Sequence, residues 1–263
     1  MKYLREEISG VMSKDFIALK PIDTAKKALH LMRNRNVSAV LVVSKEKIGF
    51  VSSLHLLKAG NFPNAKLGSI AETPPTFTLG DTVLEVSKAF VSHRAEVVPI
   101  LSSDGEVLGT VERVDIVKYA LKTGWLEGFG VKDVIVSPVT ASPSDSAGKI
   151  RRLIVKYGVG QVFILNRGKL VGIVYVEDLL EKIYAITVKR LTRGEVVGET
   201  SRILSHKAGN IMSRHVATVS IDDELSKAAK MIIGGERCVP CLLYTSDAAD
   251  DGESVDLGGR RII

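Results

Sequence analysis

Apolar residues recur at helical spacing four times along the chain, each time just after an aspartate: Asp23, Asp81, Asp145 and Asp223. Apolar positions three and four residues apart form one face of an α-helix. An aspartate in front of such a face is typical of an N-cap, because its carboxylate accepts free amide hydrogens of the first turn. The pattern predicts four capped amphipathic helices with the following apolar stripes: Ala25, Ala28, Leu29 and Met32; Val83, Val86 and Phe90; Ala147, Ile150 and Ile154; Leu225, Ala228, Ala229 and Ile232.

Paired β-branched runs follow the first three stripes. The first run of each pair covers 39–43, 97–101 or 161–165, and after a polar turn the second run opens at Gly49, Gly109 or Gly172. Two such runs across a tight polar turn predict an antiparallel hairpin. Extended segments such as 16–19 and 215–219 precede the helices, and a second helix such as 176–184 closes the unit. The glycine follows the aspartate by 26, 28 and 27 residues, so the chain repeats a strand-helix-hairpin-helix unit of about 60 residues.

The junction of the last strand and the last helix carries a shared motif. It reads Gly49-Phe-Val-Ser52-Ser-Leu-His55, then Gly109-Thr-Val-Glu112-Arg-Val-Asp115, then Gly172-Ile-Val-Tyr175-Val-Glu-Asp178. Together with the repeated unit, this motif resembles the CBS domain, the cystathionine β-synthase repeat. The resemblance implies an α/β (α+β) fold of tandem CBS repeats that pair into Bateman modules. Such modules form a disc, either within one chain or in a homodimer.

Under this resemblance the chain divides into repeats 8–60, 66–123 and 130–186, a linker at 187–208, and a truncated fourth repeat at 209–240. From Cys241 the sequence CLLYTSDAADDGESVDLGGRRII resembles a translated sequencing adapter, and no hairpin glycine or last helix follows. We therefore expect residues 241–263 to be foreign to the fold; a genuine acidic, flexible tail is the alternative. The CxxC pattern of Cys238 and Cys241 is then no redox motif, and Cys238 is expected to be a lone buried thiol.

Composition narrows the class of protein. The 263 residues are 45% hydrophobic and 25% charged, as in ordinary globular proteins, and no apolar stretch approaches the roughly 18 residues that span a bilayer. The charged start lacks the apolar core of a secretory signal, so we expect a cytoplasmic protein without membrane insertion. Scattered histidines and the lack of a Walker-type loop predict no enzyme activity, no cofactor and no metal site.

The positive net charge is compatible with a preference for anionic partners, namely nucleotides, nucleic acid or lipid headgroups. It is +6 for the whole chain and +9 without residues 241–263, because that stretch holds five acidic and two basic residues. A soluble, lysine-rich surface is the simpler interpretation, and composition does not choose between the two.

In the CBS pattern the acidic position of the motif binds the ribose diol of an adenosine ligand. A carboxylate suits this role because its oxygens can accept both hydroxyls. The resemblance thus assigns Asp178 and Asp115 as ligand-binding residues, with Tyr175 at the same site as Asp178. A structural role stays open, because Ser/Thr-x-x-Asp at this junction is close to a capping box. His55 replaces the acidic residue in repeat 1, and Glu112 at the cap of repeat 2 would repel phosphate.

A phosphate would need basic residues near the same cleft. By resemblance Arg237 is the best placed, followed by Arg94 and Arg35 at the ends of the first helices of their repeats. Thr140 and Thr218, in the opening strands, are candidates for contacts to the base or ribose. Each arginine could equally be a solvated surface charge.

These residues predict a non-enzymatic sensor that binds AMP, ADP, ATP or S-adenosylmethionine between paired repeats and signals to an effector protein. One alternative is a ligand-free interaction scaffold, which the departures at His55, Glu112 and Tyr175 favour. The other is a nucleic-acid-binding protein, which only the basic charge supports.

Overall fold

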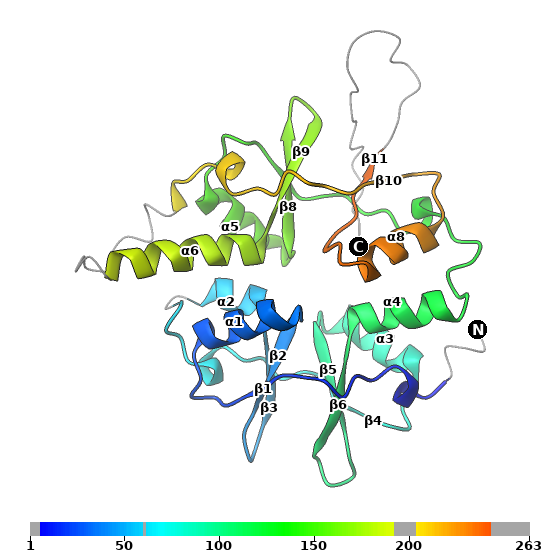
Figure 1. The fold of residues 1–263 in the computed structure, drawn as a ribbon. Helices are drawn as coiled ribbons and strands as arrows, with labels where there is room; N and C mark the ends of the chain where they lie inside the picture. The colour runs from blue at the N-terminus through cyan, green and yellow to red at the C-terminus, as the bar shows by residue number, and fades with distance from the viewer. Residues whose placement is uncertain (1–5, 60–61, 192–203, 243–263) are drawn as a thin grey trace. The chain divides into compact units, whose positions relative to one another are not determined.

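Each predicted hairpin is extended to a three-stranded sheet by the short strand that precedes the helix (Figure 1). The computed structural model describes residues 6–59, 62–191 and 204–242, and its three-stranded sheets have the orders β1-β2-β3, β4-β5-β6 and β7-β8-β9. In each, the first strand pairs in parallel with the second, which pairs antiparallel with the third. A parallel pair needs a crossover, and the helix between the two strands supplies it.

The chain divides into two compact units, Met1–Leu126 and Glu127–Ile263. The first unit contains η2 (Ile8–Gly10), β1 (Ala18–Leu19), α1 (Ala25–Arg35), β2 (Ala39–Val43), β3 (Ile48–Ser52), α2 (Ser53–Lys58), η3 (Leu67–Ser69), β4 (Phe77–Thr78), α3 (Val83–Ser92), β5 (Val97–Leu101), β6 (Val107–Glu112) and α4 (Arg113–Lys122).

The second unit contains η4 (Val131–Asp133), β7 (Thr140–Ala141), α5 (Ala147–Tyr157), β8 (Gln161–Asn166), β9 (Lys169–Tyr175), α6 (Val176–Leu191), η5 (Ala208–Asn210), β10 (Val219–Ser220), α8 (Leu225–Ile233) and β11 (Cys241–Leu242). We call residues 204–242 the C-terminal segment; it carries a two-stranded sheet, β10-β11. Within the described parts of both units, no helix is long and apolar enough to cross a membrane.

The helix after each aspartate forms where it was predicted, but the aspartate is not its N-cap. Helices α1, α3, α5 and α8 follow the N-cap residues Thr24, Thr82, Ser146 and Glu224. Each aspartate instead accepts a hydrogen bond from the backbone N–H three residues earlier, at 2.6–2.8 Å. The predicted cap was therefore wrong by one residue. In three of the four helices the hydroxyl of the residue after the aspartate accepts a hydrogen bond from the first helical turn, while the aspartate carboxylate closes the turn before the helix.

The first unit has two halves, one built on the sheet β1-β2-β3 and the other on the sheet β4-β5-β6. Each half receives the segment that leads into the other half. The segment with η2 precedes the first sheet but lies on the second, where Ser13 and Thr110 exchange backbone hydrogen bonds of 2.8 and 2.9 Å. The segment with η3 precedes the second sheet but lies on the first, where Phe50 and Glu72 exchange bonds of 2.8 and 3.1 Å. Each half is therefore completed by backbone from the other half.

The second unit repeats this exchange. The segment with η5 lies on the third sheet, where Ser213 and Ile173 exchange backbone bonds of 2.8 and 2.9 Å. The segment with η4 lies on the C-terminal segment: Val131 donates its N–H to the carbonyl of Asp223 at 2.9 Å and packs in a buried cluster with Val219. The same interlocking thus joins the third sheet to the C-terminal segment.

The exchange explains the repeated hairpin glycine. A Cβ added at Gly109 would lie 2.5 Å from the carbonyl oxygen of Ser13, and one at Gly172 would lie 2.6 Å from that of Ser213. At Gly49 the nearest atom, the Cβ of Ala71, would be 3.0 Å away. Gly109 and Gly172 mark the places where the backbone of a leading segment crosses the hairpin so closely that it leaves no room for a side chain, whereas the crossing at Gly49 is looser.

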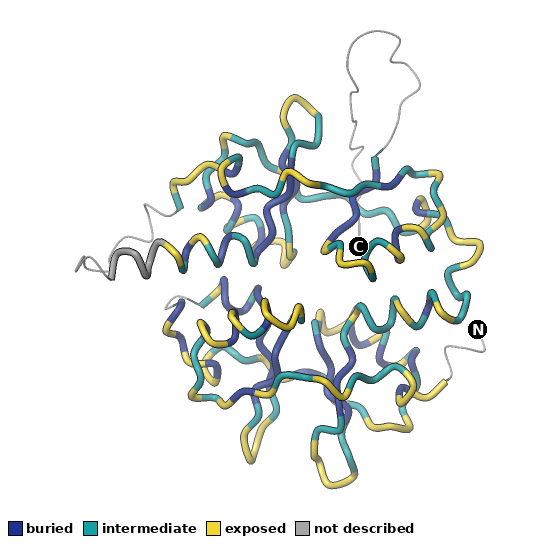
Figure 2. Tube along the Cα trace, viewed as in Figure 1, coloured by how far each residue is buried: buried dark blue, intermediate teal, exposed yellow. Residues whose placement is uncertain are grey.

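The predicted apolar stripes face the core. Figure 2 shows buried residues along the central strands and on one side of the helices. All stripe residues of α1, α3 and α5 are buried, whereas Leu225 and Ile232 of α8 are only partly buried. Two clusters join the halves of the units: Ala39, Leu41, Phe50 and Val97 in the first, and Phe163, Ile173, Tyr175 and Cys238 in the second.

The C-terminal segment continues past the expected boundary at Cys241. Cys241 is buried and pairs in parallel with Val219, so β11 contains the first two residues that we assigned to the adapter-like tail. Strand pairing uses backbone groups, which every residue except proline provides in full. Residues 243–263, and the part of the predicted linker at 192–203, lie outside the described residues.

Candidate functional site

Three predicted site residues come together in the second unit. Nη1 and Nη2 of Arg237 donate to Oδ1 and Oδ2 of Asp178 at 3.2 and 3.3 Å. The guanidinium carbon lies 3.6 Å from the centroid of the Tyr175 ring. One arginine therefore engages both oxygens of a carboxylate and one face of an aromatic ring, a bidentate ion pair combined with a cation–π contact.

The local fold positions these three groups. Tyr175 ends β9, and Asp178 lies in the first turn of α6, where the helix dipole favours a negative charge. Arg237 comes from the stretch between α8 and β11. The side chains of Arg237 and Asp178 are 44% and 29% exposed, so solvent screens their attraction. A second carboxylate, that of Glu177, lies 3.7 Å from Arg237.

The groups beneath this ion pair are neutral. Burial raises the pKa of Tyr175 to about 12, so its phenol keeps its proton at neutral pH. Burial likewise raises the pKa of Cys238 to about 11, and its thiol accepts a hydrogen bond from Gln161 at 3.3 Å. Cys238 is free and buried, as predicted, and its protonated thiol is a poor nucleophile.

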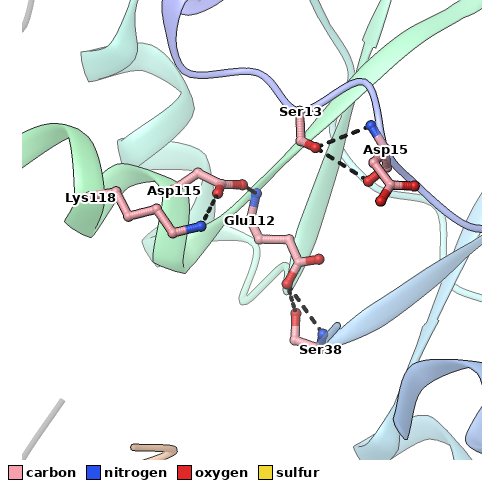
Figure 3. Close-up of polar contacts among 6 residues, drawn as sticks. All are labelled: Ser13, Asp15, Ser38, Glu112, Asp115 and Lys118. Carbon is pink, nitrogen blue, oxygen red and sulfur yellow. Dashed lines mark hydrogen bonds and ion pairs between the residues drawn. The ribbon is translucent and has the colours of Figure 1, made fainter. Parts of the chain in front are cut away.

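The corresponding junction of the first unit is occupied by the protein's own groups. Figure 3 shows Asp115 against the backbone of Glu112, and the Glu112 side chain turned toward Ser38. Oδ2 of Asp115 accepts the N–H of Glu112 at 3.0 Å, and its Oδ1 accepts from Lys118 at 3.2 Å. Asp115 therefore has the capping role that the sequence left open, and this role does not depend on a ligand.

Glu112 links the two halves of the first unit. Its Oε2 accepts hydrogen bonds from the hydroxyl and the backbone N–H of Ser38 at 2.7 and 3.2 Å. Burial raises the pKa of the Glu112 carboxyl, and the bonds from Ser38 oppose this shift. Two acidic side chains, Glu112 and Asp115, thus stand at one junction, and this concentration of negative charge disfavours a phosphate.

His55 takes over the backbone contact of the missing aspartate. Its Nδ1 accepts the N–H of Ser52 at 3.0 Å, and its Nε2 lies 3.1 Å from Oε1 of Glu72. The ring is 8% exposed and meets Phe50 edge to face at 5.0 Å. Burial lowers the pKa of His55, with Glu72 opposing the shift, so the junction of the first repeat holds a neutral imidazole instead of a carboxylate.

The other predicted site residues lie elsewhere. Arg35 ends α1 and pairs with Asp15 at 3.3 Å on the exposed surface. Arg94 was expected to end a helix, but α3 stops at Ser92, and Arg94 lies two residues beyond it with φ 51°. Thr140 is exposed in β7, and Thr218 precedes β10 by one residue and so lies outside the strand that was predicted to hold it.

Sequence reasoning missed Ser38, Glu72 and Gln161. Ser38 lies 74 residues before Glu112, and Gln161 lies 77 before Cys238, so no local pattern connects either pair. A signal did exist for Ser38: it lies between the first helix of its repeat, α1, and the strand that follows, β2, as Arg237 lies between α8 and β11. That shared position faces the helix start of the paired half in both units.

Comparison with known proteins agrees with the repeated fold. The CBS domain model matches residues 7–61, 67–122 and 131–185. Uncharacterized protein MJ1404 of Methanocaldococcus jannaschii is 26% identical over 241 residues, which are 87% of this chain and 55% of that protein. Uncharacterized protein MJ1225 of the same organism is 20% identical over 249 residues, 84% of this chain and 86% of that protein. The chain spans about half the length of MJ1404.

Two crystal structures share the fold over nearly the whole chain. One is MJ1225, described as a proposed archaeal homolog of g-AMPK, with a TM-score of 0.80, 18% identity and 95% of both chains covered. The other is an uncharacterized conserved protein of Pyrococcus horikoshii, with a TM-score of 0.62, 17% identity, and coverage of 98% of this chain and 96% of that one. Because the three segments matched by the family model make up more than half of the sequence, the chain belongs to the CBS domain family.

Proposed function

We propose that the chain is a non-enzymatic regulatory protein whose second unit binds an adenosine-type nucleotide and signals its occupancy to an effector protein. In this proposal four CBS repeats pair as two Bateman modules, one in each unit. The exchanged leading segments support the pairing, since they interlock neighbouring halves in both units. The fourth repeat is supported by the order β10, α8, β11, which follows that of the three matched repeats.

The convergence of Tyr175, Asp178 and Arg237 carries the proposal. Arg237 lies 59 residues from Asp178 in the sequence, yet the fold places their charged groups in contact. An aromatic face suits a nucleobase, a carboxylate suits a ribose diol, and a guanidinium suits a phosphate. Each part of a nucleotide thus has a partner of matching chemistry, and MJ1225, which shares the fold, is described as a proposed archaeal homolog of g-AMPK.

We assign the ligand to the second unit because neither junction of the first combines a carboxylate with an aromatic face and a guanidinium. His55 offers no charged carboxylate for a diol, and its ring nitrogens are engaged by Ser52 and Glu72. At the other junction, Glu112 is held by Ser38 beside Asp115 and adds a repelling charge. Asp115 therefore ranks below Asp178 as a ligand-binding residue.

Calorimetric titration of the chain with AMP, ADP, ATP and S-adenosylmethionine tests the proposal. We expect at least one ligand to bind, Asp178→Ala to abolish the binding, and the matched control Asp222→Ala, at an exposed site of the same unit, to retain it. Undiminished binding by Asp178→Ala would show that the site is misplaced. The absence of binding by every ligand would refute the nucleotide-sensing function.

A ligand-free interaction scaffold is the second candidate, and the self-occupied junctions of the first unit favour it. It predicts no thermal shift with any adenosine ligand and a stable complex with a protein partner. Size-exclusion chromatography with and without nucleotide would also test the homodimeric disc that the resemblance implies.

A further inference from the structure

The positive charge of the chain is concentrated on three helices. Helices α1, α5 and α8 contain no aspartate or glutamate and carry ten lysines and arginines: Lys26, Lys27, Arg33 and Arg35; Lys149, Arg151, Arg152 and Lys156; Lys227 and Lys230. The rest of residues 1–240 contains 24 basic and 25 acidic side chains, so these helices account for the +9 net charge of that part. Helix α3, at the same place in the second repeat, carries Glu85 and Lys88 and is neutral.

The basic residues form a face that points to solvent. The third residue of each helix and the residue three positions later are exposed: Lys27 and His30, Lys149 and Arg152, Lys227 and Lys230. Residues three apart share one face of a helix, and other positions of each helix are buried. The lysine at the third position pairs with the aspartate of the preceding turn at 2.8–2.9 Å. Among the described residues, neither Arg152 nor Lys230 has a carboxylate partner.

The end of α5 adds an aromatic ring to its basic residues. Tyr157, the last residue of the helix, is 40% exposed, and Nζ of Lys156 lies 5.1 Å from the centroid of its ring. Gly158 follows in the left-handed conformation, with φ 63°, and ends the helix there. An exposed ring beside cations suits a nucleic acid, because a base can stack on the ring while the charges meet phosphates.

We propose that the basic face of α5, together with Tyr157, binds single-stranded nucleic acid, and that α1 and α8 present further phosphate-binding faces. Lysine and arginine contact phosphates without regard to base sequence, and an aromatic ring accepts any base. The function is therefore independent of sequence. It is separate from the nucleotide site of Tyr175, Asp178 and Arg237, and shares no residue with it.

The exposed side chains favour this partner over an anionic membrane or an acidic protein. A basic helix on a membrane buries large apolar side chains in the lipid, and a protein interface has an apolar core. Among the described residues, α1 and α8 have no exposed large apolar side chain, and α5 has only Val155 and Tyr157. Charge with so little apolar surface suits a polyanion, and the exposed ring favours a polyanion that carries bases.

Fluorescence anisotropy of a labelled oligo(dT) with the full chain tests this proposal. We expect binding that weakens with salt. Arg152→Gln combined with Lys156→Gln should reduce the slope of log K against log salt by about 1.4, since each phosphate contact contributes about 0.7 on a single strand. Tyr157→Ala should weaken binding at least about fivefold, the lower end of the contribution of one stacked base, whereas Tyr157→Phe should bind like the wild type.

The matched control is Lys132→Gln combined with Lys207→Gln, which removes the same charge from exposed positions of the same unit outside these helices and should leave the slope unchanged. Excess AMP should not compete with oligo(dT); competition would place the oligonucleotide in the nucleotide site and overturn the proposal. An unchanged slope in the α5 double variant, or undiminished binding by Tyr157→Ala, would also overturn it. So would a lack of binding, or equally tight binding to heparin or to phosphatidylserine vesicles.

Discussion

The crossing of the leading segment over the hairpin can be tested by adding a single methyl group. In Gly109→Ala the new Cβ would lie 2.5 Å from the carbonyl oxygen of Ser13 and 2.6 Å from Cγ of Met12. Ordinary contacts of this kind are 3.4–4 Å, so one of the two backbones must move by roughly 1 Å. The Met12 side chain can rotate away, but the Ser13 carbonyl belongs to the paired backbone and cannot.

The magnitude follows from the bonds that this movement strains. Ser13 and Thr110 exchange two backbone hydrogen bonds of 2.8 and 2.9 Å, each contributing about 1 kcal/mol. Forcing a methyl group into a packed site costs about 1–3 kcal/mol in addition. We expect Gly109→Ala to lower the free energy of unfolding by about 3–5 kcal/mol. Gly172→Ala, at 2.6 Å from Ser213, should behave alike, and Gly49→Ala, at 3.0 Å, should cost less.

Urea titration measures this effect, and the position of the single tryptophan assigns it to one unit. Trp125 is the only tryptophan and lies in the first unit with Gly109, so its fluorescence reports on that unit. Gly80→Ala is the matched control, since nothing lies within 4 Å of its added Cβ. It should leave stability unchanged or raise it by about 0.4–1 kcal/mol. A loss below about 1 kcal/mol in Gly109→Ala would refute the crossing as the reason for the glycine.

The remaining predictions concern single side chains. Ser38→Ala removes the 2.7 Å bond to Glu112 and should cost about 0.5–1.5 kcal/mol in urea titration; an unchanged midpoint would contradict the link between halves. Burial lowers the pKa of His55 in the folded state, so its stabilisation is complete above pH 6.5 and is lost as the pH falls through the lowered folded value. His55→Asn should therefore flatten the stability profile below pH 6.5, and an unaltered slope would count against this. Ile154→Ala, at a site with 0% exposure, should cost about 2–5 kcal/mol by circular dichroism, whereas the exposed neighbour in Val155→Ala should change stability by less than about 1 kcal/mol; equal losses would contradict the packing.

The repeated elements were predictable because they are local. Helical spacing of apolar residues and paired β-branched runs each depend on a few neighbouring positions, and the structure confirms the helices and hairpins they predicted. The N-caps were wrong by one residue, since the choice between Asp23 and Thr24 depends on which oxygen reaches the turn, a matter of backbone direction. The opening strands were also shorter than predicted, because their ends are decided by the partner strand.

The site was predictable only as separate residues. Resemblance singled out Tyr175, Asp178 and Arg237, but nothing in their spacing indicated that one guanidinium would bind the carboxylate and cover the ring. Likewise the sequence contained Glu112 and His55 as departures from a motif, without the partners Ser38 and Glu72 that engage them. These partners lie in other repeats or in leading segments.

By itself the sequence determined the repeat, its helices and hairpins, and the glycine in each hairpin, because periodicity and chain stiffness act over a few residues. The tertiary structure alone decided why that glycine is needed, since Gly109 is crowded by Ser13, a residue almost a hundred positions earlier. It also decided which charges meet. Contacts between Arg237 and Asp178 depend on the closure of a long loop, and a loop is closed by the packing of whole sheets and helices, which no local pattern encodes.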